Sequence, residues 1–382
     1  MSRPMMGSIK LALLLVTCLP PRHASAQGAL PNAQESRFIM PFLEGTDVFI
    51  SPDGRTGVDG TIFEANIYPH LIVWQNFTDA IAVQDEKPAG EPRTARARRV
   101  DDTLHRIRWS VSGTPAVRIR MFKDVSDPVR TPSYMPRVNV QALWARDVPG
   151  VLERANRKRE GTAAKHPALG LWEAHVIVGH HSNGQDGCFY TMQTRPTGRT
   201  PKEELPCEPE VVPANAETAK ALVNRRDGSF STNYVRAGMN YRLNWIDADT
   251  LVAFRELSIG AEVEEHPARW MDEHEVNLYG RTRINSFADY AIRGTEHICP
   301  ARAEGRFSAN YIVGAPSTVS DWTLSGQVSC FPTSSGGWGV FARYYRGQDY
   351  YNIAFLNQIR RWELGATFNQ DGFFRFRRVQ SK

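Results

Sequence analysis

A histidine and a serine that lie two residues apart are the first candidates for chemistry in this chain. They belong to the string Gly179-His180-His181-Ser182-Asn183-Gly184. A serine hydroxyl becomes a good nucleophile only when a base takes its proton, and imidazole is the commonest such base. In a strand, residues i and i+2 share a face, so His180 and Ser182 would be neighbours while His181 would point away. Polar residues at the end of an ordinary strand would give the same string, so the spacing alone leaves both interpretations open.

Two predicted strands would position these side chains. Segments 172–182 and 233–245 alternate with period two, the pattern of a β-strand. If the two segments pair as a hairpin, Asn233 has the parity to join His180 and Ser182 and to accept a ring N–H of the histidine. One face of each segment is mainly apolar and carries an aromatic residue at its start or end: Trp172, Ala174, Val176 and Val178 in the first, and Val235, Ala237, Met239, Tyr241, Leu243 and Trp245 in the second.

An apolar stripe backed by a polar stripe is what a membrane-spanning β-strand requires, although a soluble β-sandwich gives the same alternation. The alternation recurs in 307–313, 322–329 and 362–368. Segments 84–102, 147–168 and 184–228 are rich in charged residues or proline, and we expect long loops there, with a short helix as the alternative for 147–162. No run after residue 26 approaches the length of a membrane helix.

The composition excludes some classes of protein. The chain has 382 residues, of which 41% are hydrophobic and 23% charged, too apolar for a disordered chain. Its formal net charge is only +5, and three of its basic residues (Arg3, Lys10 and Arg22) fall in the N-terminal segment. A nucleic-acid binder would normally show a stronger basic excess, so we expect no nucleic-acid partner.

The N-terminus has the layout of a secretory signal peptide. A basic start precedes the apolar stretch from Ile9 to Val16, and Ala24-Ser25-Ala26 offers a small-x-small cleavage site. We predict a signal peptide over 1–26 and an exported chain. Four cysteines then remain, and an even number in an exported protein favours disulfides. Three pairings are possible, and we favour pairing of sequence neighbours, Cys188 with Cys207 and Cys299 with Cys330.

Four segments resemble the outer membrane phospholipase A family, and they occur in the family's order. The string Gly179–Gly184 is similar to the family's His-Asp-Ser-Asn-Gly motif, with His181 in place of the aspartate. The other three are Asp127–Pro136, Ser231–Tyr234 and Tyr345–Ala366. The resemblance implies an all-β fold: an antiparallel transmembrane β-barrel of about twelve strands with long polar loops. The segment 27–100 exceeds what aligns; we treat it as an N-terminal extension, with a first strand as one option, followed by the barrel over 101–382.

The family's site residues carry over position by position. The resemblance implies Ser182 as nucleophile, His180 as general base, Asn233 as the residue that orients the imidazole and Gly184 as the main-chain donor to the oxyanion. It further implies a calcium ion (Ca2+) near this position and a homodimer as the active form. The calcium ligands would be Ser229, Gln185 and the partner-facing Asp127, although the loop 185–228 is longer than the family's and solvated-loop roles are equally open for Gln185 and Asp127.

The resemblance therefore implies an outer membrane phospholipase of the A1/A2 type, a carboxylic ester hydrolase acting on phospholipids. Two alternatives are a non-catalytic outer membrane barrel, porin-like or structural, and a soluble exported β-sandwich esterase. Head-group and sn-position preference do not follow from the sequence.

Overall fold

The computed structural model describes part of the chain. The described residues are 45–51, 61–75, 82–84, 107–122, 132–145, 148–162, 165–185, 187–190, 218, 221–224, 228–247, 253–267, 270, 279–293, 299, 301–314, 320–332, 337–349, 351, 355, 357–369 and 377–379. The predicted signal peptide, Asp127 and Cys207 lie outside them.

The strands are β1 (Thr46–Ile50), β2 (Thr61–Ile67), β3 (Leu71–Gln75), β4 (Ala82–Gln84), β5 (Arg108–Phe122), β6 (Ser133–Ala145), β7 (Ala168–Ser182), β8 (Ser231–Ile246), β9 (Ala253–Glu265), β10 (Thr282–Arg293), β11 (Arg302–Val313), β12 (Trp322–Phe331), β13 (Gly337–Gln348), β14 (Gln358–Asn369) and β15 (Arg377–Val379).

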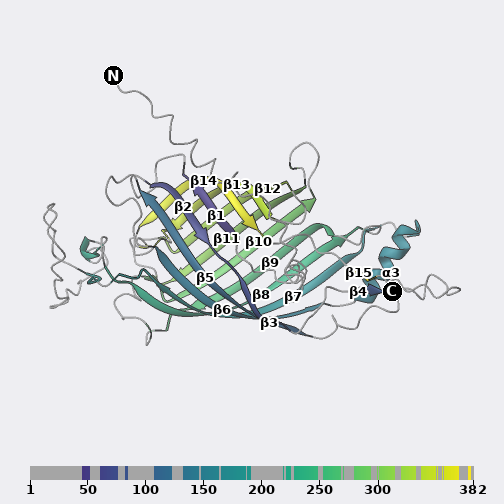
Figure 1. Ribbon diagram of the computed structural model, residues 1–382, viewed down its shortest axis with the longest axis horizontal. Coiled ribbons are helices and arrows are strands. Elements are labelled where there is room, and N and C mark those ends of the chain that lie inside the picture. Colours follow the sequence, from purple (N-terminus) through teal and green to yellow (C-terminus); the bar gives the residue numbers. More distant parts are fainter. Residues whose placement is uncertain are drawn as a thin grey trace, which may run out of the picture. The chain divides into compact units, whose positions relative to one another are not determined.

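The main sheet closes on itself as an antiparallel β-barrel. From β5 to β14 each strand pairs with the next in sequence, and β14 pairs with β1, which pairs with β2. The ring is completed because β2 also pairs with β5. The short β3 runs along another part of β5, so β2 and β3 occupy one position in the wall and the barrel has twelve strands. Figure 1 shows purple β1 beside yellow β14 where the barrel closes. The predicted fold class is confirmed.

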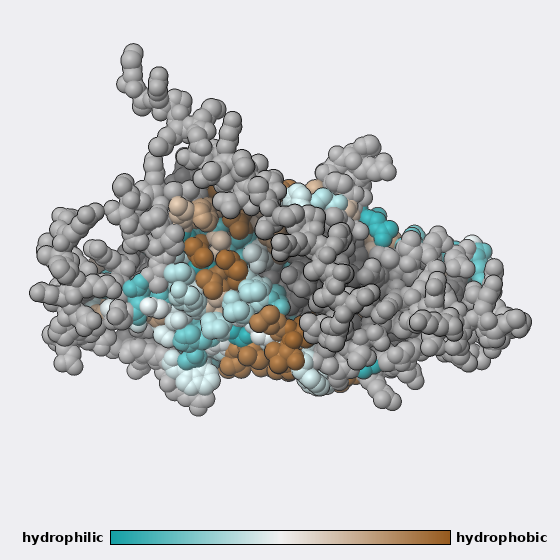
Figure 2. Space-filling model, in the orientation of Figure 1, coloured by the Kyte–Doolittle hydropathy of each residue, from teal (hydrophilic) through white to brown (hydrophobic). Residues whose placement is uncertain are grey.

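The strands alternate between an outer apolar face and an inner polar face. Val176, Val178 and Met239 are 46%, 52% and 50% exposed, although they are apolar. Residues of the opposite parity in β7, such as Glu173 and His175, are buried inside the barrel. An outward apolar face and an inward polar face are typical of a membrane-spanning barrel. On the face seen in Figure 2, brown apolar patches lie among hydrophilic ones.

The barrel begins nearer the N-terminus than the predicted boundary at residue 101. Strands β1, β2 and β3 all come from the segment 27–100, and the pairing of β1 with β14 closes the barrel. These strands are five to seven residues long, too short to give a strong alternation in the sequence. Strands β4 and β15 form a separate parallel pair.

A charged network inside the barrel spans the seam where the first and last strands meet. Arg120 of β5 holds Asp349 through two hydrogen bonds of 2.8 and 2.9 Å and lies 3.0 Å from Glu64 of β2. Arg361 of β14 donates to the same Glu64 carboxylate at 3.0 Å, and to Glu363 at 2.6 Å. All five side chains are buried. Buried charges are tolerated only when they are paired, so each member depends on the others.

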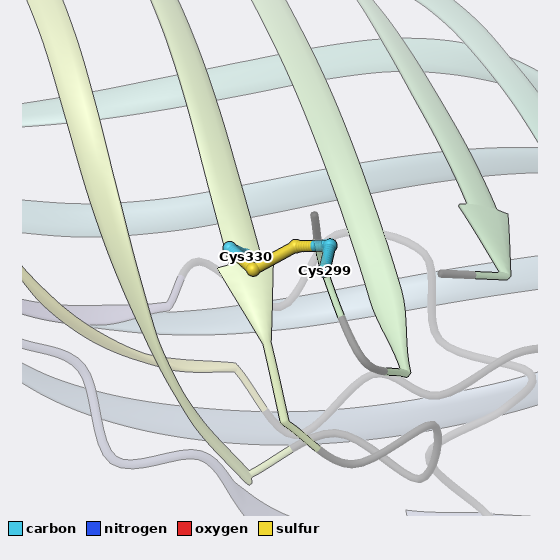
Figure 3. The surroundings of a disulfide bond; sticks show 2 residues. All are labelled: Cys299 and Cys330. Atoms are coloured by element: carbon cyan, nitrogen blue, oxygen red, sulfur yellow. A yellow bond between two sulfur atoms is a disulfide. The ribbon is translucent and has the colours of Figure 1, made fainter. Parts of the chain in front are cut away.

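One predicted disulfide is confirmed. Cys299 and Cys330 are joined, with Cα atoms 5.5 Å apart and a sequence separation of 31 residues, and Figure 3 shows the bond at the end of β12. Cys188 is also disulfide-bonded; its expected partner Cys207 lies outside the described residues.

The segment predicted as a loop or short helix contains α3 (Val148–Arg159). Its Val151 and Ala155 are buried, and its charged residues include an ion pair between Arg157 and Glu153. In the part of the chain that the structure describes, no helix has both the length and the apolar character needed to cross a membrane.

We expect Glu64→Gln to destabilise the barrel strongly. The change removes the carboxylate that Arg120 and Arg361 share, so of these carboxylate partners Arg120 keeps Asp349 and Arg361 keeps Glu363. Leaving buried charged groups short of a hydrogen-bond partner costs about 1–3 kcal/mol or more. The matched control is Glu153→Gln in α3, where the Glu153 and Arg157 side chains are 63% and 54% exposed and the cost should stay below about 0.5 kcal/mol. Urea unfolding in detergent micelles measures both, and equal midpoints for the two variants would contradict the role given to the network.

Candidate active site

The β7–β8 pairing brings His180 and Asn233 together. The two residues are direct partners in the register, and His180 Nδ1 lies 2.8 Å from Asn233 Oδ1. Both side chains are on the outward face of their strands. His180 comes two residues after the exposed Val178 of β7, and Asn233 comes two residues before Val235 of β8. With the amide oxygen as acceptor, Nδ1 carries the proton, and the lone pair of the ring lies on Nε2. A neutral imidazole in this tautomer can act as a base through Nε2.

Ser182 is placed on the same outward face, at the end of β7. It pairs with Ser231 of β8 on one side and with Tyr134 of β6 on the other. In the described residues Ser182 has no hydrogen bond to the His180 ring, and such contacts are often long before substrate binds. Ser182 is half-buried and is the last residue of β7, where the strand with its apolar outer face passes into the polar segment Asn183-Gly184-Gln185. His181, in contrast, is buried on the inner face, as the parity predicts.

Gly179 permits the close approach of the two strands beneath the site. A Cβ at this position would lie 2.3 Å from the ring of its partner Tyr234, which is buried inside the barrel. A side chain there would displace the Tyr234 ring from its place inside the barrel. The glycine of the motif is therefore explained by packing on the inner face.

A clamp built on Asn183 joins the two arms of the long β7–β8 loop. Its buried side chain donates to the Gly228 carbonyl at 2.7 Å and accepts from the main-chain N–H groups of Phe230, at 3.0 Å, and Gln185, at 3.3 Å. The N–H of Ser229 donates to the Gly187 carbonyl at 2.7 Å, which adds a second connection. The loop, although 48 residues separate Ser182 from Ser231 in the chain, therefore begins and ends as a narrow continuation of the hairpin.

The clamp fixes the conformation of Gly184. This glycine has φ +63°, in the left-handed region that favours glycine. A Cβ there would lie 3.3 Å from the ring of Tyr134. The motif's Asn-Gly pair is thus used as a turn whose asparagine side chain binds nearby main-chain groups.

The candidate calcium ligands on the loop lie on opposite arms of the clamp. Ser229 offers a hydroxyl and Gln185 a main-chain carbonyl, and Asn183 ties both arms together. Both are hard oxygen donors, the type of ligand that Ca²⁺ prefers. Both are also neutral, and a site with few charged ligands binds Ca²⁺ weakly. Within the described residues no group of three His, Cys, Asp or Glu side chains has an arrangement able to hold a metal ion.

Aromatic residues pack beneath the clamp. Phe189, Tyr190 and Phe230 of the β7–β8 loop contact Tyr279 and Phe355 from two other loops. Burial raises the pKa of the Tyr279 phenol, which stays protonated. This cluster supports the clamp from the inner side.

Sequence reasoning missed the residues that act through long-range contacts. Thr232 and His266 hydrogen-bond on the inner face directly behind Asn233, and nothing local to either residue indicates it. The role of Asn183 in a turn could have been predicted, because an asparagine before a glycine is a known turn signal.

We expect Asn183→Ala to loosen the clamp without unfolding the barrel. The change removes three hydrogen bonds, one to the Gly228 carbonyl and two from main-chain N–H groups, at a cost of about 1–3 kcal/mol. Hydrogen exchange at the amides of Gln185 and Phe230 should become faster, while amides in mid-β7 keep their protection. Unchanged exchange at both amides would rule out the clamp.

The solved structures that are similar to this chain cover most of its length. A scan against family models and a search of curated proteins found no match. Among solved structures, the outer membrane phospholipase A of Escherichia coli is similar at 8% identity and a TM-score of 0.45, covering 88% of this chain and 98% of that one. A calcium-bound dimer of the Salmonella typhi outer membrane phospholipase is similar at 9% identity and a TM-score of 0.43, covering 90% and 99%. OmpT of Vibrio cholerae gives 7% identity and a TM-score of 0.22, covering 85% and 94%.

Proposed function

We propose that this chain is an outer membrane phospholipase that hydrolyses the acyl ester bonds of phospholipids. Ser182 is the nucleophile, His180 the general base and Asn233 the residue that orients the imidazole. The observation that carries the proposal is the 2.8 Å contact from His180 Nδ1 to Asn233 Oδ1 on the outer, apolar face of the barrel.

The position of the site selects the substrate class. Below Ser182 the outer surface is lined by exposed Val176 and Val178, and β6 adds exposed Val138 and Val140. An acyl chain would lie along this surface, so an ester at the head-group level of a membrane would meet the serine at the rim. A water-soluble ester would gain nothing from that apolar surface.

Each residue of the site has its own part in the chemistry. His180 Nε2 takes the Ser182 proton as Oγ attacks the ester carbonyl, and the C–O bond to the glycerol oxygen then breaks as that proton passes to the leaving alcohol. Water hydrolyses the acyl-enzyme by the same route, which releases a fatty acid and restores the serine. Asn233 keeps the ring in the required tautomer but, being neutral, stabilises the imidazolium less than an aspartate would. The N–H of Gly184 serves the oxyanion.

The resemblance of the motifs adds a calcium ion and a dimer to the proposal. The ion would be held by the Ser229 hydroxyl and the Gln185 carbonyl, with a carbonyl of Asp127 from a second copy of the chain. When bound, it supplies positive charge beside the oxyanion. Such a requirement would restrain hydrolysis in an intact membrane.

The proposal predicts that an alkyl fluorophosphonate labels Ser182 in detergent with calcium. Ser182→Ala and His180→Ala should abolish labelling and lower phospholipid hydrolysis by about 10³-fold or more. The matched control is Ser231→Ala, which removes the paired serine on the same face and should leave both readouts unchanged. Hydrolysis that persists in Ser182→Ala would reject the proposal, and absence of labelling and hydrolysis in the unmodified chain would favour the non-catalytic barrel.

Removal of calcium should lower kcat by about 10²–10³-fold, the typical contribution of a preorganised charge at an oxyanion. Because the available protein ligands are neutral, half-maximal activation should require about 10⁻⁴ M calcium or more. Ser229→Ala should raise that concentration further, as titration of EDTA-treated protein measures. Full activity in EDTA would contradict the calcium site.

A further inference from the structure

The segment of β8 that carries Asn233 extends beyond the strand on its other side. The pairing of β8 with β9 begins at Val235, opposite Glu265, the last residue of β9. From Ser231 to Tyr234 the register pairs β8 with β7 alone. A strand segment paired on one side is held less firmly than one inside a ladder. Asn233 therefore needs another restraint to stay in contact with His180.

Side chains on the inner face supply that restraint. His266, one residue past the end of β9, places Nδ1 3.0 Å from the hydroxyl of Thr232. The same hydroxyl oxygen lies 3.3 Å from the main-chain oxygen of Asn233. Thr232 is fully buried and His266 only 1% exposed. The contact thus replaces the missing rungs between β8 and β9.

His266 is itself fixed by charged groups in the barrel interior. Its Nε2 lies 3.0 Å from Glu264 Oε1, and Arg236 Nε donates to the other oxygen of that carboxylate at 2.9 Å. The main-chain N–H of His266 donates to the Arg281 carbonyl at 2.9 Å. The ring also packs against Tyr234 and Tyr279. Both ring nitrogens and the main chain are therefore engaged, so the ring has one orientation.

We infer that Thr232 and His266 are positioning residues, which hold Asn233 against His180 from the inner face of the barrel wall. This inference rests on the proposed function and adds to it. Neither residue touches the outer surface, so neither contacts a lipid substrate. Loss of the anchor should affect the rate of the chemical step and leave lipid binding unchanged.

The test combines kinetics with hydrogen exchange on the full chain in detergent. Thr232→Val keeps the shape and removes the hydroxyl, and it should lower kcat about 10-fold with KM unchanged. Exchange of the amides in 231–234 should become about 3- to 10-fold faster, in keeping with the net value of one hydrogen bond. Thr232→Ser retains the hydroxyl and should restore both values. His266→Ala should reproduce the effect of Thr232→Val, and if it fails to fold, the two Thr232 variants decide.

The matched control removes a comparable hydrogen bond between β8 and β9, away from the site. Ser258 Oγ donates to Asn240 Oδ1 at 2.8 Å, and both residues are buried inside the barrel. Ser258→Ala should leave kcat and the exchange of 231–234 as they are. An equal loss of kcat in Ser258→Ala and Thr232→Val would mean that both substitutions act only by lowering the general stability of the barrel. That result would overturn the inference.

The outcomes separate this inference from the proposed function. If the unmodified chain hydrolyses phospholipid and Ser182→Ala does not, unchanged kcat in Thr232→Val overturns the anchor alone. If the unmodified chain does not hydrolyse lipid, the proposed function fails, and hydrogen exchange still decides the anchor. Faster exchange in Thr232→Val but not in Thr232→Ser supports it, and equal exchange in both overturns it.

Discussion

The strict alternation of side chains along the strands is the constraint on which the rest of this structure depends. One face of each strand meets an apolar environment and the other a polar interior, so a shift by one residue would expose charges outward and valines inward. The cost of such a shift, summed over a barrel, fixes the register of every strand. The same register places His180 opposite Asn233. The candidate site is therefore positioned by the hydrophobic pattern of the whole wall.

The polar interior is part of the same arrangement. Charged side chains within the barrel pair with one another across several strands, as Glu64 does with Arg120 and Arg361 at the seam. Near the site Glu264 binds both Arg236 and His266. A wall braced from inside in this way keeps its outer face rigid, which a site built on that face requires.

Features that depend on local pattern could be predicted from the sequence. Period-two alternation identified β7 and β8, and parity put Asn233 on the face of His180 on the condition that the two segments pair as a hairpin. The contacts that were missed connect residues far apart in the chain. The pairing of β1 with β14 joins Thr46 to Phe368, and the short alternation in β1 could not indicate it. Thr232 lies on β8 and His266 just past the end of β9, and neither carries a local signal of their contact. Asn183 lies between these two cases. The Asn-Gly pair indicates a turn, but nothing in the sequence indicates the hydrogen bonds of Asn183 with Gly228 and Phe230.

The claim that the site faces the lipid is tested most directly by nitroxide accessibility in phospholipid vesicles. Spin labels at single-cysteine variants of positions 180 and 233 would be compared with labels at 181 and 232. The account predicts that collisions with oxygen, which concentrates in the bilayer, exceed those with a water-soluble nickel chelate at 180 and 233, whereas 181 and 232 are shielded from oxygen. A label at 233 that behaves like the one at 181 would contradict the account.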